Sequence, residues 1–235
     1  MPLSEVILDW QIVEGEMGRG KNKGTSLKVL LVVVPIEFVN QYQEIANLAG
    51  LKLQAVEAEA FSLLRSLVGK DKRSVCVIDM GAQSTTVNIA DKGILKKSHS
   101  FDISGNEFTK VISESLRITM QEAEKLKKDK GMSQGDLSPR KILIPLMDHI
   151  ARETENIFRT FSQLEGKNVE KIILAGSSVQ MPELREYFSE TFKREVEIAD
   201  PFANIFYPPI LEKKIKSMGP AYSIAVGNAL RGLEL

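Results

Sequence analysis

Apolar and polar positions follow two different periods along the chain, which predicts a mixture of strands and helices. Short apolar or alternating runs predict strands over Val6–Val13, Leu27–Val34, Leu51–Val56, Val75–Ile89 (a hairpin), Ile94–Phe101, Val169–Leu174 and Glu195–Ile198. Helical spacing predicts helices over Ile36–Ala49, Glu57–Val68, Gly105–Leu116, Thr119–Lys130, Ser138–Leu164, Glu183–Phe192 and Ala221–Leu230. Strands and helices in this mixed order indicate an α/β or α+β fold with two or three lobes.

Local signals mark the ends of several predicted helices. Thr119 and Glu122 fit a capping box, and Ser138-Pro139 fits a helix start with serine as the cap. Pro145 lies inside the long helix, where it would either kink the helix or mark its true start. The buried face of this helix is predicted at Leu146, Ile150, Ile157, Phe161 and Leu164.

The order of these elements predicts a division of the chain into three parts. Residues 1–55 would form a small β-β-α-β lobe, with a polar, glycine-rich hairpin loop from Gly15 to Gly24. Residues 56–73 would add a helix. Residues 74–235 would form a larger lobe, with a helical subdomain at about 105–165.

Composition excludes several classes of protein. Among the 235 residues, 31 Lys and Arg balance 31 Asp and Glu, so no net charge favours nucleic acid as a partner. The single cysteine, Cys76, lies in an apolar strand, which excludes internal disulfides and fits a reducing compartment. No apolar run approaches the roughly 20 residues of a membrane helix, and the N-terminus lacks the pattern of a signal peptide. We therefore expect a cytoplasmic protein without direct membrane insertion.

The first candidate for chemistry is the turn of the hairpin Val75–Ile89. An apolar strand ends at Asp79, where a carboxylate can hold a hydrated magnesium ion. Gly81 lets the backbone approach an anion, and further donors for phosphate oxygens follow at Gln83, Ser84, Thr85 and Thr86. Without further support, the same residues fit an ordinary hairpin turn equally well.

A second candidate is the strand–glycine–helix segment Ile172–Leu184. The predicted strand leads to Gly176, and Ser177 and Ser178 follow as small hydrogen-bond donors before Pro182. A glycine at this point lets a ribose and its α-phosphate lie against the backbone. Taken alone, the segment could also be a plain strand-to-helix turn.

Together these elements resemble the second half of the actin, heat-shock-70 and sugar-kinase ATPase fold. The closest resemblance is to the type IV pilus assembly protein PilM family, which is related to the cell-division protein FtsA. The pairing of Gly105–Thr109 with the Ala-Glu-x-Leu-Lys helix Ala123–Lys127 is typical of both, as is the ending Ala221–Gly232. The opening block Ser4–Gly50 is similar to the small lobe inserted in their first half. The resemblance covers nearly the whole chain.

This resemblance implies an actin-like, ribonuclease H-like arrangement that binds ATP and Mg2+. Residues 56–73 would be a remnant of the first actin-like lobe, and residues 74–235 would be the second lobe. Asp79 would hold Mg2+ through water, and Gly81, Gln83 and Ser84 would lie at the phosphates. The adenosine would contact Glu124, Lys127, Gly176, Ser177 and Ser178. Glu124 and Lys127 lie one helical turn apart, although such a pair is more often part of a solvated helix face.

The resemblance also implies a catalytic acid at Glu59, near the attacking water. Relatives have proline after this acid, whereas this chain has Ala60, and Ser104 stands where relatives often have glycine. The family's first phosphate loop, an Asp-x-Gly-x-x-x-x-Lys hairpin, is missing from the sequence. We therefore expect a chain that lacks the N-terminal part of the family, as a gene fragment or through loss. Weak nucleotide binding with little or no ATPase activity should follow, because phosphoryl transfer depends on positioning and charge.

The expected function is that of a PilM-like component of the type IV pilus inner-membrane assembly platform. Residues Leu27–Gly50 would help to bind the cytoplasmic tail of a PilN-like membrane protein, which would hold the chain at the inner membrane. Self-association stays open. Alternative functions are an FtsA-like division protein, a GspL-like secretion component or an actin-fold ATP-dependent kinase. An FtsA-like protein would usually end in a basic amphipathic helix, which the ending Ala229–Leu235 does not match.

Overall fold

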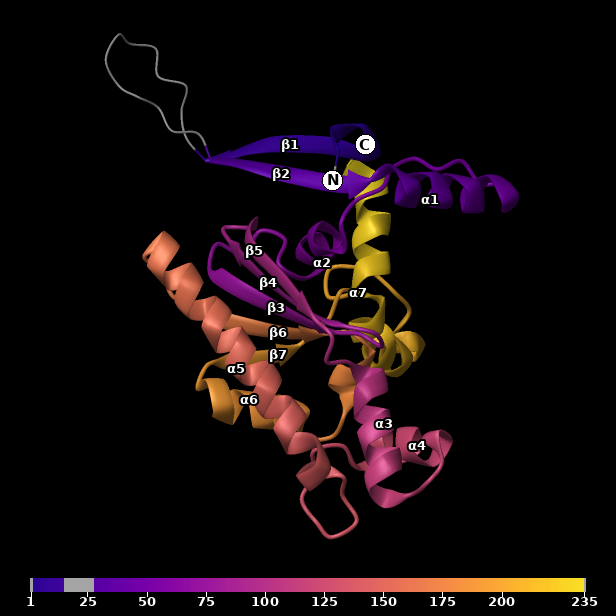
Figure 1. Cartoon of the computed structure of the whole chain (residues 1–235), viewed down its shortest axis with the longest axis vertical. Helices are drawn as coiled ribbons and strands as arrows, with labels where there is room; N and C mark the ends of the chain where they lie inside the picture. The colour runs from indigo at the N-terminus through magenta and orange to yellow at the C-terminus, as the bar shows by residue number, and fades with distance from the viewer. Residues whose placement is uncertain (1, 15–27, 235) are drawn as a thin grey trace. The chain divides into compact units, whose positions relative to one another are not determined.

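The computed structural model describes residues 2–14 and 28–234, so the predicted loop from Gly15 to Gly24 lies outside the described residues. The chain forms two compact units, Met1–Glu57 and Ala58–Leu235 (Figure 1). Within the described ranges, no helix is long and apolar enough to cross a membrane. The strands and helices together make a mixed α/β protein, as the sequence predicts.

Within residues 2–14 and 28–57, the first unit contains a two-stranded antiparallel sheet and one α-helix. A short 3-10 helix (Leu3–Glu5) leads into β1 (Val6–Glu14), which pairs with β2 (Lys28–Pro35) before α1 (Ile36–Leu48). The strand predicted over Leu51–Val56 is wrong, because residues 51–58 form neither a helix nor a strand. A segment becomes a strand only when its backbone pairs with another strand. Residues 51–56 pair with none of the described strands.

The second unit is built on a five-stranded sheet with the order β5-β4-β3-β6-β7. Its strands are β3 (Ser74–Met80), β4 (Thr85–Asp91), β5 (Ile94–Phe101), β6 (Lys171–Ala175) and β7 (Glu195–Ile198). The first three strands pair in antiparallel fashion, whereas β3 with β6 and β6 with β7 are parallel. Asp79 therefore lies opposite Thr86 on one side and Ala175 on the other.

Helices cover both faces of this sheet (Figure 1). The helices of the second unit are α2 (Glu59–Leu67), α3 (Gly105–Leu116), α4 (Met120–Lys130), α5 (Arg140–Glu165), α6 (Leu184–Phe192) and α7 (Glu212–Glu234), with 3-10 turns at Ser177–Gln180 and Pro209–Leu211. Alternate residues of β3 point to opposite faces. Cys76 and Ile78 lie in the core with α5 and α6, and Val75 and Val77 pack on the other face with α2.

The predicted helix signals hold at most positions. Thr119 and Glu122 form both hydrogen bonds of the capping box at the start of α4. The predicted start of α5 is one residue off, because the helix begins at Arg140 and Pro139 occupies the N-cap, although Ser138 Oγ accepts a hydrogen bond from the Arg140 N–H at 3.1 Å. The helix runs through Pro145 without a break. Leu164 was predicted to be buried but is 72% exposed, because it lies in the last turn of α5.

Helix α7 begins earlier than the sequence predicts. The prediction started it after Pro220, whereas the helix begins at Glu212 and runs through this proline. The Pro220 carbonyl accepts a hydrogen bond from the Gly176 N–H at 2.9 Å, and the Ser223 hydroxyl donates to it at 3.0 Å. The bond from Gly176 comes from a segment distant in sequence and ties this part of α7 to the residue that follows β6.

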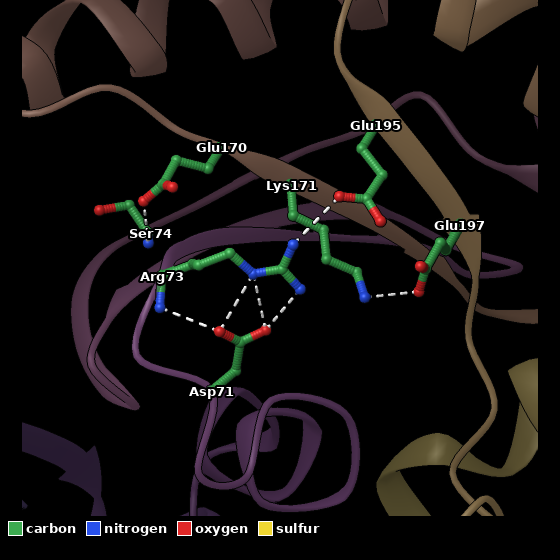
Figure 2. Close-up of polar contacts among 7 residues, drawn as sticks. All are labelled: Asp71, Arg73, Ser74, Glu170, Lys171, Glu195 and Glu197. Atoms are coloured by element: carbon green, nitrogen blue, oxygen red, sulfur yellow. Dashed lines mark hydrogen bonds and ion pairs between the residues drawn. The ribbon is translucent and has the colours of Figure 1, made fainter.

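A charged network joins the strand starts at one end of the sheet (Figure 2). Arg73 donates hydrogen bonds to both carboxylate oxygens of Asp71 and pairs with Glu195 at 3.1 Å. Lys171, the first residue of β6, pairs with Glu197 of β7 at 2.5 Å. The hydrogen bonds from Arg73 hold the pKa of Asp71 below its usual range. These pairs link the beginnings of β3, β6 and β7, opposite the end that carries Asp79.

Helices α2 and α7 approach each other so closely that no side chain fits between them at one point. A Cβ on Gly227 would lie 2.0 Å from the Ser62 carbonyl oxygen. Around this contact, the Ser62 hydroxyl donates to Asn228 Oδ1 at 2.6 Å and the Ser66 hydroxyl donates to the Ser223 carbonyl at 2.8 Å. The glycine therefore sets the distance between the two helices.

Substituting alanine for Gly227 should lower the free energy of unfolding by about 2 kcal/mol, because the added methyl group must push α2 away from α7. Gly232→Ala is the matched control on the same helix, since a Cβ there meets nothing within 4 Å. The control should be neutral or raise stability by up to about 1 kcal/mol, as alanine does in open helix positions. Urea unfolding followed by circular dichroism measures both, and equal stability of the two variants would contradict the close contact.

Candidate functional site

Asp79 and Gly176 meet where β3 and β6 end side by side. Gly176 follows Ala175, the residue paired with Asp79, and has a φ of 95°. A Cβ at Gly176 would lie 2.5 Å from the Met80 carbonyl oxygen and 2.7 Å from Asp79 Oδ1. Both the backbone angle and the close approach require glycine. The two predicted motifs, more than ninety positions apart in sequence, therefore form one site.

The electrostatics of this site favour a cation beside Asp79. Burial, together with the charge of Glu59, raises the pKa of Asp79 to about 6. Glu59, the predicted catalytic acid, is the exposed first residue of α2. Its negative charge acts on Asp79 and contributes to the raised pKa of that carboxyl group. A divalent cation near Asp79 would offset both burial and the neighbouring negative charge.

A magnesium ion held through water fits this donor set. No group of three or more His, Cys, Asp or Glu side chains that could ligate a metal occurs within residues 2–14 and 28–234. Mg2+ keeps several of its waters, however, and is often held by one or two carboxylates together with substrate phosphates. Asp79 could supply such a carboxylate, with Glu59 near it.

The turn between β3 and β4 is docked on the first turn of α3. Within the turn, the Gly81 N–H donates to the Ser84 carbonyl at 3.0 Å. The Gly81 carbonyl accepts from the Gly105 N–H at 2.9 Å, and the Ala82 carbonyl accepts from the Asn106 N–H at 3.0 Å. These bonds use amide groups that a helix start leaves without intrahelical partners. The turn that follows Asp79 is therefore held by α3.

Gly105 is a third position where a side chain would not fit. A Cβ there would lie 2.4 Å from the Ser178 hydroxyl oxygen and 3.2 Å from the Gly81 carbonyl oxygen. Gly105 thus lets the hairpin turn, the start of α3 and the segment after Gly176 pack together.

A cavity of about 370 Å3 opens where these three segments meet. It is lined by Ala82, Gly105, Asn106, Glu124, Lys127, Lys128, Ser177, Ser178, Gln180 and Met181. Four of the predicted adenosine-side residues are among these: Glu124, Lys127, Ser177 and Ser178. Gly81 and Gly176 each precede a lining residue in the chain, and Asp79 lies against Gly176.

Besides Asp79, Gly81 and Gly176, three further predicted site residues do not line this cavity. Gln83 is exposed at the tip of the hairpin turn, and Ser84 is half-buried, with its carbonyl bonded to the Gly81 N–H. Glu59 lies at the start of α2 and is connected to the site through its effect on Asp79.

Glu124 and Lys127 form a partly buried ion pair instead of a solvated helix face. Lys127 is 5% exposed, and its Nζ lies 2.6 Å from Glu124 Oε2. Partial burial acts to raise the pKa of Glu124, but hydrogen bonds from Lys127, Thr109 and Lys128 outweigh it and lower this pKa to about 2. The carboxylate is therefore charged at neutral pH.

Sequence reasoning missed several residues of the site. Asn106, Lys128, Gln180 and Met181 line the cavity, and Thr109 bonds to the Glu124–Lys127 pair from α3. The glycine that opens α3 was the available signal for Asn106. The others depend on contacts between α3, α4 and residues 177–181, for which a single sequence gives no sign.

Solved structures with this fold include one protein bound to two different nucleotides and a complex from pilus assembly. A PilM–PilN type IV pilus biogenesis complex aligns with a TM-score of 0.83 and 21% identity over 99% of this chain and 68% of that chain. MreB5 of Spiroplasma citri bound to AMPPNP aligns with a TM-score of 0.63 and 16% identity over 84% and 64% of the two chains. The same protein bound to ADP gives a TM-score of 0.57 over 84% and 65%. These similarities establish an actin-like fold.

Curated relatives are cell division proteins FtsA. The protein of Bacillus subtilis is 25% identical over 183 residues, which are 65% of this chain and 40% of that protein. The protein of Pseudomonas aeruginosa is 22% identical over 231 residues, which are 88% of this chain and 54% of that protein. The chain therefore spans about half the length of the curated relatives that it matches.

A family model provides the decisive comparison, because it matches almost every residue. The model is described as type IV pilus assembly protein PilM, and the match runs over residues 1–233. The matched residues include both the first unit and the second unit, which carries Asp79, Gly105 and Gly176. The chain belongs to the PilM family of type IV pilus assembly proteins.

Proposed function

We propose that this PilM-family chain binds Mg-ATP at the site around Asp79 and binds the cytoplasmic tail of a PilN-like membrane protein through its first unit. The observation that carries the nucleotide proposal is the meeting of Asp79, Gly105 and Gly176 beside the cavity. Each glycine stands where a Cβ would collide with a neighbouring segment. Such close packing of backbone and carboxylate suits a phosphate and its cation.

Within this proposal, each part of the site has a chemical role. Asp79 would hold Mg2+ through water, and the turn beginning at Gly81 would approach the phosphates. Ser177 and Ser178 would line the adenosine side of the cavity, opposite Glu124 on α4. Support comes from their shared place in the cavity wall and from the charged state of Glu124.

We infer that nucleotide binding matters more than turnover in this chain. Glu59 would be the acid near the attacking water, but Ala60 replaces the proline of relatives, and the given sequence contains no Asp-x-Gly-x-x-x-x-Lys hairpin. Phosphoryl transfer needs several groups that stabilise charge together. Weak binding with little or no ATPase activity is therefore the proposed behaviour.

The partner proposal rests on an apolar surface of the first unit. Residues directly paired across β1 and β2 share a face, so Trp10 and Leu31 lie side by side. The exposed side chains of this face are Leu8, Trp10, Ile12, Val29, Leu31 and Val33, which are 38–64% exposed. Apolar surfaces of this kind mark interaction sites. A PilN-like tail bound here would place the chain at the inner face of the inner membrane.

Titration calorimetry tests the nucleotide proposal. The chain should bind Mg-ATP, and Asp79→Asn should weaken binding at least tenfold, because the neutral amide cannot replace the carboxylate beside Mg2+. Asp129→Asn removes a carboxylate from an exposed position on α4 and should bind like the parent. Absence of Mg-ATP binding by the folded parent chain would contradict the proposal.

The same substitution should stabilise the ligand-free protein. The pKa of Asp79 is about 6, above the ordinary value of 3.8, so the folded state prefers the protonated acid. The charged form therefore lowers stability above pH 6, and this cost disappears as the pH falls toward 3.8. Asp79→Asn should raise the free energy of unfolding by up to about 3 kcal/mol at pH 7.5, and by about 1 kcal/mol at pH 4.5. An equal increase in the free energy of unfolding at pH 7.5 and pH 4.5 would contradict the raised pKa of Asp79.

Fluorescence of Trp10 tests the partner proposal, because this residue is the only tryptophan of the chain. A synthetic peptide with the cytoplasmic tail of a PilN-like protein should cover Trp10, which is 64% exposed, and shift its emission to shorter wavelength. Leu31→Lys should weaken the peptide's affinity roughly tenfold by placing a charge next to Trp10. Leu137→Lys, at an 82% exposed position of the second unit, is the control. Binding that leaves the emission unchanged would place the tail elsewhere.

A further inference from the structure

A buried polar cluster behind the cavity links helices α3 and α4. It consists of Thr109 from α3 and of Glu124 and Lys127 from α4. Thr109 is 4% exposed and Lys127 is 5% exposed, so both polar groups depend on partners inside the protein. Their hydrogen bonds show which member of the cluster can still bind a ligand.

Lys127 uses its whole donor capacity within the protein. An ammonium group has three donors and no acceptor. Its Nζ lies 2.6 Å from Glu124 Oε2, 2.9 Å from the Gly105 carbonyl oxygen and 2.9 Å from Thr109 Oγ1. With these three acceptors satisfied, Lys127 has no N–H left for a molecule in the cavity.

Thr109 both accepts and donates in this cluster. Its hydroxyl accepts from Lys127, and its oxygen lies 2.5 Å from Glu124 Oε2 and 3.0 Å from the Gly105 carbonyl oxygen. A hydroxyl has one proton. The nearer and charged acceptor is Glu124, and hydrogen bonds to charged groups are the stronger ones. Thr109 therefore donates its proton to the Glu124 carboxylate.

The two oxygens of Glu124 are held differently. Oε2 is bound from inside by Thr109 and Lys127. Oε1 lies 3.1 Å from Nζ of Lys128, whose side chain is 69% exposed, and Glu124 itself lines the cavity with its side chain 37% exposed. Oε2 is thus anchored by two buried groups. Oε1 is bound by an exposed lysine side chain and faces the cavity, so it can accept hydrogen bonds from a ligand.

We propose that Thr109 is a positioning residue that aims Glu124 Oε1 at the ribose hydroxyls of a bound nucleotide and keeps Lys127 as an internal support without ligand contact. This inference rests on the proposed nucleotide function. Acidic side chains recognise ribose hydroxyls by accepting their hydrogen bonds. Such recognition needs a fixed carboxylate, and a carboxylate with one oxygen bound by Thr109 and Lys127 is fixed.

The cluster is also joined to the turn that follows Asp79. Lys127 binds the Gly105 carbonyl, and the Gly105 N–H binds the Gly81 carbonyl. A single residue at the start of α3 therefore connects the sugar side of the cavity with the phosphate side. Without the Thr109 hydroxyl, Glu124 Oε2 loses one of its two donors, so the Glu124 carboxylate should become less fixed. Lys127 would stay in place, because it keeps two of its three acceptors.

Thr109→Val tests the role of the hydroxyl, because valine has nearly the same shape. Calorimetry should show Mg-ATP binding weakened roughly 10- to 150-fold, the range expected when a hydrogen bond to a charged group is lost. The preference for ATP over 2′-deoxy-ATP should fall toward one, because a loose carboxylate no longer reads the 2′-hydroxyl. Thr109→Ser restores the hydroxyl and should recover most of both properties.

Ser113→Ala is the matched control on the same helix. Its hydroxyl donates to the Ile118 carbonyl at 2.6 Å, at the far end of α3 from the cavity. The substitution should lower thermal stability while affinity and the ATP preference stay at parent values. If valine prevents folding, Thr109→Ala carries the same test with a smaller side chain.

The outcomes separate this inference from the function on which it rests. A folded parent chain that does not bind Mg-ATP would contradict the proposed function itself. A parent that binds, together with a Thr109→Val variant of unchanged affinity and preference, would overturn the positioning role alone. Equal weakening for ATP and 2′-deoxy-ATP would also overturn it, because Thr109 would then act only on the general structure of the site.

Discussion

The candidate site depends first on the parallel pairing of β3 with β6. This pairing sets Asp79 opposite Ala175, so that the next residue of β6, Gly176, must pass the end of β3 at a distance that excludes any side chain. Every other part of the site is arranged around this contact. The turn after β3 lies on the start of α3, and the segment after Gly176 lies against Gly105.

The opposite end of the same strands explains why this pairing holds its register. Arg73 connects Asp71 with Glu195, and Lys171 connects β6 with β7 through Glu197 (Figure 2). A slip by one residue would break these pairs and would also move β3 side chains between the two cores. Charged groups thus specify the strand alignment at one end of the sheet. The other end carries Asp79 and Gly176, which form the candidate site.

The sequence predicted what local patterns determine and missed what distant contacts decide. The bounds of β5, α3 and β7 followed from periodicity and glycine positions. The early start of α7 did not, because the carbonyl of Pro220 is bonded to Gly176 far away in sequence. The burial of Lys127 was equally hidden, since its acceptors at Gly105 and Thr109 come from a different helix. Asp79 and Gly176 were recognisable as motifs, whereas their mutual distance became visible only in the folded chain.

If a cation binds at Asp79 as proposed, the raised pKa of this carboxyl group would make binding a competition with a proton. At mildly acidic pH the ligand-free protein would hold that proton more readily than an ordinary aspartic acid, and a divalent cation would have to displace it. The heat of binding measured near this pH should then depend on the ionisation enthalpy of the buffer that takes up the proton. The acid whose charge lowers the stability of the folded chain would then couple the proposed metal binding to proton release.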